Sequence, residues 1–289
     1  MVDQLLQIDR PAVLSRGAMV VSLTGWMDGG NASTATVELL RELVGGDAAG
    51  HIDPAPFYLL NFPGSMEIAA MFRPRVKVAD GVLEHIEMPE NRFWVCPRQN
   101  LALFSGQEPN MRWELYTDCV FTAAHRLGVE TVLFIGSVGG AVPHTRDPRV
   151  YASASDATMR QRLLTCHVPF TNYEGPGSVT TYMLSRAVDA GLSMGTLVAE
   201  IPAYVQGRNP RAILTLLRKL AAVLGTWLDL ESLRSIVDQW EKRVNEAVGQ
   251  HPDLLEHIQR LEEEYDNDVF ETQMSDLKDW LEQKGIQVD

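Results

Sequence analysis

Short apolar runs alternate with amphipathic segments along the first 225 residues. The runs predict buried strands at 18–25, 56–62, 131–140, 168–175 and 195–205. The segments between them repeat apolar residues every three or four positions and predict helices at 31–43, 110–128, 153–165, 177–191 and 210–225. Strands that alternate with helices favour an α/β protein, in which helices cover both faces of a largely parallel sheet.

Residues 75–88 interrupt this alternation. Apolar and polar residues alternate at period two on both sides of Asp80-Gly81. An Asp-Gly pair between two such segments predicts a tight β-hairpin. We therefore expect a β-hairpin insertion in the core, followed by an extended stretch over 93–106.

After Gly225 the pattern becomes helical only. Three apolar stripes at helical spacing lie near 230–244, 254–261 and 270–281. The segment is also acidic, because residues 231–289 contain 16 acidic and 6 basic side chains. We expect an α/β core over 1–227 and an acidic helical subdomain over 228–289. That subdomain is either a packed appendage with a solvated face or a lid over the edge of the sheet.

Composition narrows the class of partner. The formal net charge is −13, which argues against nucleic acid and anionic membranes, since both favour a basic surface. No apolar stretch approaches the roughly 18 residues of a membrane span, and the first residues do not resemble a secretory signal. The three cysteines lack metal or redox spacing. We expect a cytoplasmic protein with reduced thiols.

Familiar catalytic motifs are missing from the chain. The sequence has no phosphate-binding P-loop, no G-x-G-x-x-G after the first strand and no paired-histidine metal spacing. The stretch Gly136–Gly140 is not a nucleophile elbow, because Ile135 stands where that motif requires glycine. We expect no metal site, and the sequence identifies no cofactor.

Unusual polar residues follow several predicted strands. Loops that run from strand to helix leave a parallel sheet at its carboxyl edge, where ligands bind. Three such loops are 25–31, 137–147 and 173–178, and a fourth is 204–209. The candidate ligand-binding residues are Asp28, Asn31, His144, Thr145, Arg146, Glu174 and Tyr204.

These residues support two readings. In the functional interpretation, Arg146 makes a bidentate contact with a small anionic ligand, and His144, the best catalytic candidate, transfers a proton. In the other, the same residues are structural: Asp28 and Asn31 cap a helix, His144 makes buried hydrogen bonds, and Arg146 pairs with Asp147. Only the convergence of all four loops would favour a ligand site.

Five stretches resemble the proteasome assembly chaperone 2 family in its actinobacterial form. They are GWMDGGNAS (25–33), FWVCPRQNLALFSGQEPNMRW (93–113), PHTRDPRV (143–150), YEGPGSVTTYML (173–184) and AEIPAYV (199–205). Relatives often read Pro-His-Tyr where this chain has Pro202-Ala203-Tyr204, which weakens a mechanism that needs a second histidine.

The resemblance implies a three-layer α/β/α core with a mixed, mostly parallel sheet, like phosphorylase and hydrolase folds. It also implies self-association, with a homotrimer favoured and the hairpin as the contact. The resulting interpretation is a protein that binds a ligand or a protein partner and acts in assembly. The alternative is a hydrolase or phosphorylase-like enzyme for a small anionic or nucleoside-like substrate.

Overall fold

The computed structural model describes residues 1–9 and 14–283. Its centre is an eight-stranded sheet in the order β1-β3-β6-β7-β2-β8-β10-β9. The four central strands are parallel, and the strands toward both edges are antiparallel. The strand bounds are β1 Leu6–Ile8, β2 Gly17–Thr24, β3 Asp47–Ile52, β6 Arg92–Cys96, β7 Leu101–Gln107, β8 Val129–Gly140, β9 Val150–Ala154 and β10 Ser193–Pro202.

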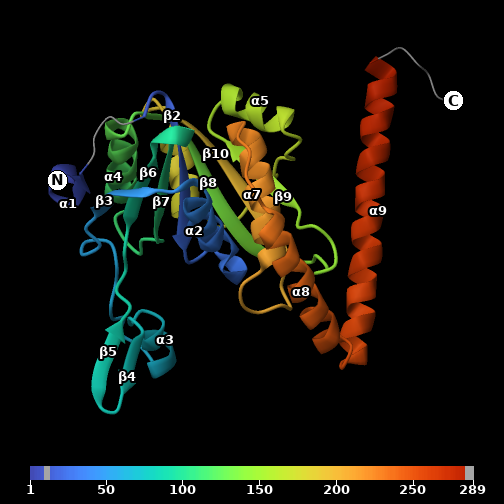
Figure 1. Cartoon of the computed structure of the whole chain (residues 1–289), viewed down its shortest axis with the longest axis horizontal. Helices are drawn as coiled ribbons and strands as arrows, with labels where there is room; N and C mark the ends of the chain where they lie inside the picture. Colours follow the sequence, from blue (N-terminus) through green and yellow to red (C-terminus); the bar gives the residue numbers. More distant parts are fainter. Residues whose placement is uncertain (10–13, 284–289) are drawn as a thin grey trace.

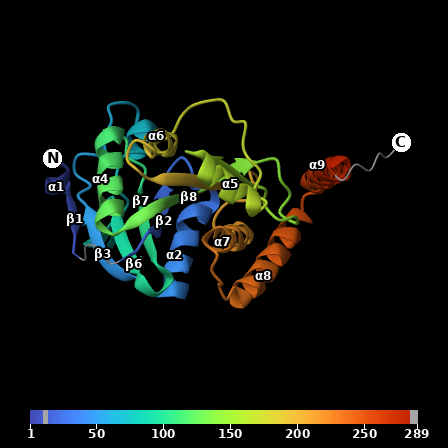
Figure 2. The same cartoon turned by 90° about the horizontal axis from the view of Figure 1, so that it is seen from above.

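Helices cover both faces of this sheet, as expected for a three-layer α/β/α fold. Figures 1 and 2 show α2 and α7 on one face and α4 and α6 on the other. Each face has its own buried cluster, which includes Leu103 and Leu133 on the α2 side and Phe104 and Phe134 on the α4 side. The helix bounds in the core are α1 Val2–Leu5, α2 Ala32–Val44, α4 Trp113–Arg126, α5 Ala157–Thr165, α6 Val179–Arg186 and α7 Pro210–Leu224.

The predicted hairpin is confirmed. Strands β4 (Val76–Ala79) and β5 (Val82–Ile86) pair across Asp80-Gly81 and form a separate two-stranded sheet. With the short helix α3 (Met66–Ala70) they project from the body of the molecule (Figure 1). We call residues 59–89 the hairpin module.

The chain after α7 forms two helices, α8 (Glu231–Val248) and α9 (Pro252–Gln283). The sequence predicted three apolar stripes, and the second and third both fall within the single long helix α9. The side chains of the last stripe beyond Met274, and residues 284–289, lie outside the described residues. Figure 1 shows α9 standing beside α8 at the edge of the core.

Several predicted boundaries are wrong. Residues 56–62 form a turn that buries Phe57 and Tyr58 rather than a strand, and 168–175 contains one isolated bridge, between Phe170 and Ala152. Strand β9 occupies the start of the helix predicted over 153–165. Helix α5 begins only after Asp156, whose side chain accepts from the Met159 amide at 2.9 Å. Strand β3 was missed because its alanines and glycine show no apolar alternation.

Candidate functional site

The loops after β2, β8 and β10 meet at the carboxyl edge of the sheet, as predicted for 25–31, 137–147 and 204–209 from the parallel strands. Strands β2, β8 and β10 are parallel neighbours, so the loops after them leave on the same side. The Ser137 amide donates to the Met27 carbonyl at 2.8 Å, and the Asn209 amide donates to the Gly30 carbonyl at 3.1 Å. Gly30 has a φ of 58°, and a Cβ there would lie 2.9 Å from the Ile201 side chain. Its glycine is therefore required for this close approach.

The loop at 173–178 reaches this edge by another route, through Glu108. It follows no strand, but it leads into α6, and the Val179 amide at the start of α6 donates to one Glu108 oxygen at 3.4 Å. The Trp26 amide donates to the other oxygen at 2.9 Å. A Cβ on Gly25 would lie 3.0 Å from the Glu108 side chain. The sequence reasoning missed Glu108, although it directly follows β7 within one of the quoted family stretches.

Asp28 lies at the start of α2 and acts as a cap. Its carboxylate accepts from the Thr34 amide at 3.0 Å and from the Thr34 hydroxyl at 2.7 Å. Burial raises the pKa of Asp28, and the hydrogen bonds from Thr34 and Ser33 oppose that shift. Asn31 precedes the helix in the left-handed conformation, and its side chain makes no capping bond. The capping role therefore belongs to Asp28.

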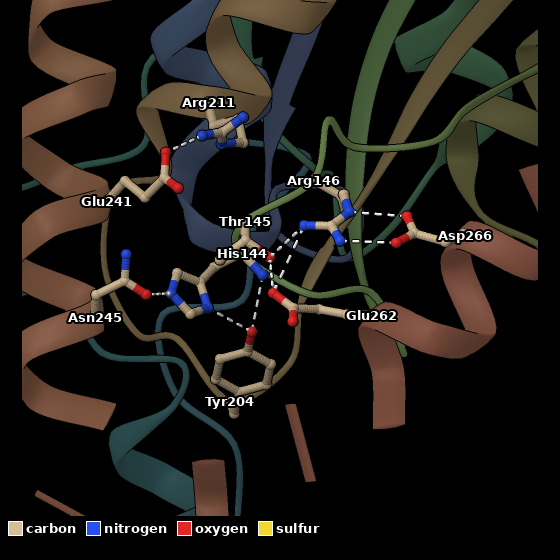
Figure 3. Close-up of polar contacts among 9 residues, drawn as sticks. All are labelled: His144, Thr145, Arg146, Tyr204, Arg211, Glu241, Asn245, Glu262 and Asp266. Carbon is tan, nitrogen blue, oxygen red and sulfur yellow. Dashed lines mark hydrogen bonds and ion pairs between the residues drawn. The ribbon is translucent and has the colours of Figure 1, made fainter. Parts of the chain in front are cut away.

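His144 is buried, with 1% of its surface exposed, and both ring nitrogens have partners. Nε2 lies 2.9 Å from the Asn245 amide oxygen on α8, and Nδ1 lies 2.8 Å from the Tyr204 hydroxyl (Figure 3). Because an amide oxygen only accepts, Nε2 carries the proton and Nδ1 accepts from Tyr204. The Tyr204 oxygen in turn accepts from the His144 backbone amide at 2.8 Å.

The electrostatics support this arrangement. Burial lowers the pKa of His144, although Asn245, Glu241 and Glu262 favour the charged ring. Burial also raises the pKa of Tyr204 to about 12, so its hydroxyl stays protonated at neutral pH. The neutral imidazole is thus held in one tautomer between the core and α8.

Thr145 and Arg146 bind the acidic side of α9. Arg146 forks onto Asp266, with Nε to Oδ1 at 2.8 Å and Nη2 to Oδ2 at 2.7 Å (Figure 3). The Thr145 hydroxyl donates to Glu262. The Arg146 guanidinium holds the pKa of Asp266 below its ordinary value. A bidentate pair of this kind uses the geometry that would otherwise recognise an anionic ligand.

The same pattern continues along the loop. Arg149 pairs with Asp268 at 2.7 Å and lies 4.6 Å from the centre of the Tyr265 ring. The Tyr265 hydroxyl donates to the Asp147 carbonyl at 2.8 Å, and on α8 Glu241 pairs with Arg211. None of the residues on α8 and α9 was predicted individually. The signal for them was the excess of acidic side chains after residue 231.

Two cavities, of about 520 and 400 Å³, have none of the seven candidate residues in their walls. Glu174 is exposed on its loop. Both ring nitrogens of His144 already have hydrogen-bond partners, and the Arg146 guanidinium already binds Asp266. Within residues 1–9 and 14–283 there is no cluster of three or more His, Cys, Asp or Glu suited to a metal ion. In this structure His144 and Arg146 are therefore engaged in contacts within the chain.

Comparison with known proteins agrees with the sequence motifs. The model of the PAC2 family matches residues 22–248, which is most of the chain. The chain belongs to the PAC2 family. A proteasome-assembly chaperone homologue from Mycobacterium tuberculosis is similar to this PAC2 chain, with 28% identity, a TM-score of 0.71, and coverage of 83% of this chain and 99% of the other. No curated protein sequence matches.

Two further solved structures extend the comparison. A PAC2 family protein from Streptomyces avermitilis has 28% identity and a TM-score of 0.69, over 83% of this PAC2 chain and 99% of its own. A protein of unknown function from Mycobacterium tuberculosis has 22% identity and a TM-score of 0.79, over 92% of each chain. The last likeness shows the fold alone. No helix in the part of the chain that the structure describes is long and apolar enough to cross a membrane.

Proposed function

We propose that this PAC2 chain is an assembly protein that binds protein surfaces, its own copies included, through the hairpin module. The observation that carries the proposal is the exposure of this module. No residue from 59 to 90 is buried. Of the 23 large apolar side chains that are exposed in the described residues, 11 lie between Leu60 and Met88.

A module of this kind is incomplete by itself. An isolated two-stranded hairpin is marginally stable in water, and contiguous exposed apolar patches mark interaction sites on soluble proteins. Both edges of the β4–β5 hairpin are open for pairing, since it joins no other sheet in the described residues. Covering the module with another chain would bury Val82, Leu83 and Ile86, which are 43–67% exposed.

The family supports a protein partner. The similar Mycobacterium tuberculosis structure is described as a homologue of a proteasome-assembly chaperone. We propose that proteasome subunits are the protein partner of this chain. We propose a homotrimer as its self-assembled form. The enzyme alternative, which acts on a small anionic or nucleoside-like substrate, is not favoured. A ligand at His144 and Arg146 would require their contacts with α8 and α9 to open.

Two broader predictions belong to this proposal. We propose a cytoplasmic location, in keeping with a chaperone-like family. We also propose that residues 228–289 form a subdomain distinct from the core over 1–227, because the regular structure in its described part consists of the two helices α8 and α9.

Native mass spectrometry of the full chain tests the self-association. We expect the wild type to form a homotrimer and the charged variants Val82→Glu and Leu83→Glu to shift toward the monomer, because a buried carboxylate without a partner is costly. Val188→Glu is the matched control. Val188 is 55% exposed and lies outside the module, so this variant should assemble like the wild type.

A monomeric wild type at micromolar concentration would contradict the self-association. Affinity capture addresses the second half of the proposal. Proteasome subunits should co-purify with the wild type and with Val188→Glu, and should be lost with Leu83→Glu. Capture that is equal for all three proteins would show that the hairpin module does not hold the partner.

A further inference from the structure

A cavity of about 400 Å³ lies where the hairpin module joins the core. We call it the hairpin-root cavity. The module contributes the walls at 59–60, 71–75, 87 and 89, and the core contributes Gln107 and Asn110. Gln107 is the last residue of β7, so the cavity opens at the carboxyl edge of the sheet, at a strand that none of the predicted candidate residues follows.

Two arginines without an ion-pair partner among the described residues line this cavity. Arg73 donates to the Asn61 side-chain oxygen at 3.1 Å, and neither Arg73 nor Arg75 forms an ion pair within the described residues. The Arg75 carbonyl accepts from the Glu87 amide at 2.8 Å, which fixes the base of the hairpin. Glu87 is the one carboxylate on the wall, so the two arginines outnumber it. This contrasts with Arg146, whose guanidinium already donates two hydrogen bonds to Asp266.

The core side of the cavity adds neutral donors. The Asn110 side-chain oxygen accepts from the Leu59 amide at 3.0 Å, which directs its NH2 group elsewhere. The side-chain amide of Gln107 makes no hydrogen bond within the described residues.

The remaining walls are apolar. They comprise Leu59, Leu60, Met71, Phe72, Pro74 and Pro89. The Phe72 ring stacks on Phe62 at 5.1 Å, which holds one of these walls in place. The volume falls within the range of roughly 300–1,000 Å³ typical of small-molecule sites, and it far exceeds the space that one bare anion needs. The cavity therefore has room for a ligand that carries an apolar part as well as a charged group.

We propose that the hairpin-root cavity binds an organic oxyanion, which is a carboxylate or phosphate group on an apolar or aromatic body. Arg73 and Arg75 take the charged group, as arginine does where planar oxyanions are recognised. Gln107 and Asn110 supply further hydrogen bonds, and the apolar walls take the body. Because the walls come from the hairpin module and from the core, the ligand holds the two together. This inference needs no protein partner and extends beyond the proposed function.

Isothermal titration of the full chain tests the site with four probes. They are phenyl phosphate, phenylacetate, inorganic phosphate and the neutral 2-phenylacetamide. We expect at least one of the two aromatic anions to bind saturably, and inorganic phosphate and the neutral amide to bind about tenfold more weakly or not at all. The tighter of the two aromatic anions identifies the head group.

Variants locate the binding. Arg73→Ala with Arg75→Ala should weaken the aromatic anion about tenfold or more, since charged hydrogen bonds are the strongest of their kind. Arg98→Ala is the control, because Arg98 is exposed and has no ion pair within the described residues and does not line the cavity. Hydrogen exchange should slow at 59–60, 71–75 and 107–110 when the ligand binds.

Any of the following results would overturn the inference. The first is no saturable binding of either aromatic anion up to millimolar concentration. The second is that the neutral amide binds as tightly as the aromatic anions, which would show that the cavity recognises only the apolar ring and not the charge. The third is unchanged affinity in the double variant, or protection confined to 143–149, either of which would place the anion elsewhere. Neither arginine contributes to a buried core, so the variants should fold.

Discussion

His144 connects three parts of the chain through one side chain. It belongs to the loop after β8, it accepts from Tyr204 after β10, and it donates to Asn245 on α8. A histidine with both nitrogens bonded and 1% exposure stabilises an arrangement rather than exchanging protons with a substrate. His144 therefore contributes to holding α8 on the core.

The pH dependence of stability should report this role. The pKa of His144 is lowered in the folded state, chiefly by burial, so near pH 6 the unfolded chain binds more protons. Its contribution to stability is therefore complete above about pH 6.5 and is lost as the pH falls below that value. Urea unfolding should show that the wild type has a lower free energy of unfolding at pH 5.5 than at pH 8.0.

His144→Gln provides the comparison. This variant cannot titrate, so it should lose less stability over the same pH interval. At pH 8.0 it should be less stable than the wild type by about 1–3 kcal/mol, because buried partners lose hydrogen bonds. An identical pH slope for both proteins would show that another group titrates. The charged groups facing the ring are Glu241, Glu262 and Arg211.

At the scale of elements, the start of α2 depends on a residue several positions before it. Asp28 caps the helix from across the turn Gly29–Asn31. Asp28→Ala should destabilise the protein by about 1 kcal/mol, as the loss of a cap usually does. Thermal or urea unfolding measures the change.

The matched variant is Asp28→Asn, whose side-chain oxygen can still accept from the Thr34 amide. It also removes a buried charge whose pKa burial already raises. We expect it to stay within about 0.5 kcal/mol of the wild type. If both variants were equally unstable, the negative charge and not the cap would be the stabilising feature.

Long elements with a full hydrophobic period were predictable, and so was the short hairpin with its Asp-Gly turn, but other short or edge elements were not. Helices α2, α4 and α7 and strands β2, β8 and β10 lie within a few residues of their predicted ranges. The run at 56–62 failed because Phe57 packs against Tyr116, at 5.1 Å between ring centres, from a turn. Apolar residues show that a segment is buried, but a short run does not show its backbone conformation.

On the scale of the whole molecule, the uneven charge of the chain has a structural counterpart. The acidic helices α8 and α9 contact the arginines of the core at the loop 143–149 and at Arg211. Many of these side chains are partly exposed; those of Arg146 and Asp266 are 35% and 53% exposed. Exposed ion pairs contribute little each and are screened by salt. The attachment of α9 should therefore depend on ionic strength.

Hydrogen exchange of residues 254–270 tests this attachment. Arg146→Ala should speed exchange there, and raising the salt from 50 to 500 mM should do the same in the wild type. Arg208→Ala serves as the control, because Arg208 pairs with Glu38 on an exposed surface away from α9. Exchange that responds neither to salt nor to Arg146→Ala would mean that Ile258 and Leu261, both buried, hold the helix alone.

The sequence by itself determined the α/β class, the hairpin, the helical tail and the family, because each depends on local periodicity or on contiguous motifs. It also predicted that polar loops meet at the carboxyl edge, since parallel strands require this. Only the tertiary structure decided what those residues contact. His144 and Arg146 face α8 and α9, about a hundred residues away in the chain, while Arg73 and Arg75 line a cavity without ion pairs. Pairing between distant side chains depends on how the elements pack, and no local pattern records it.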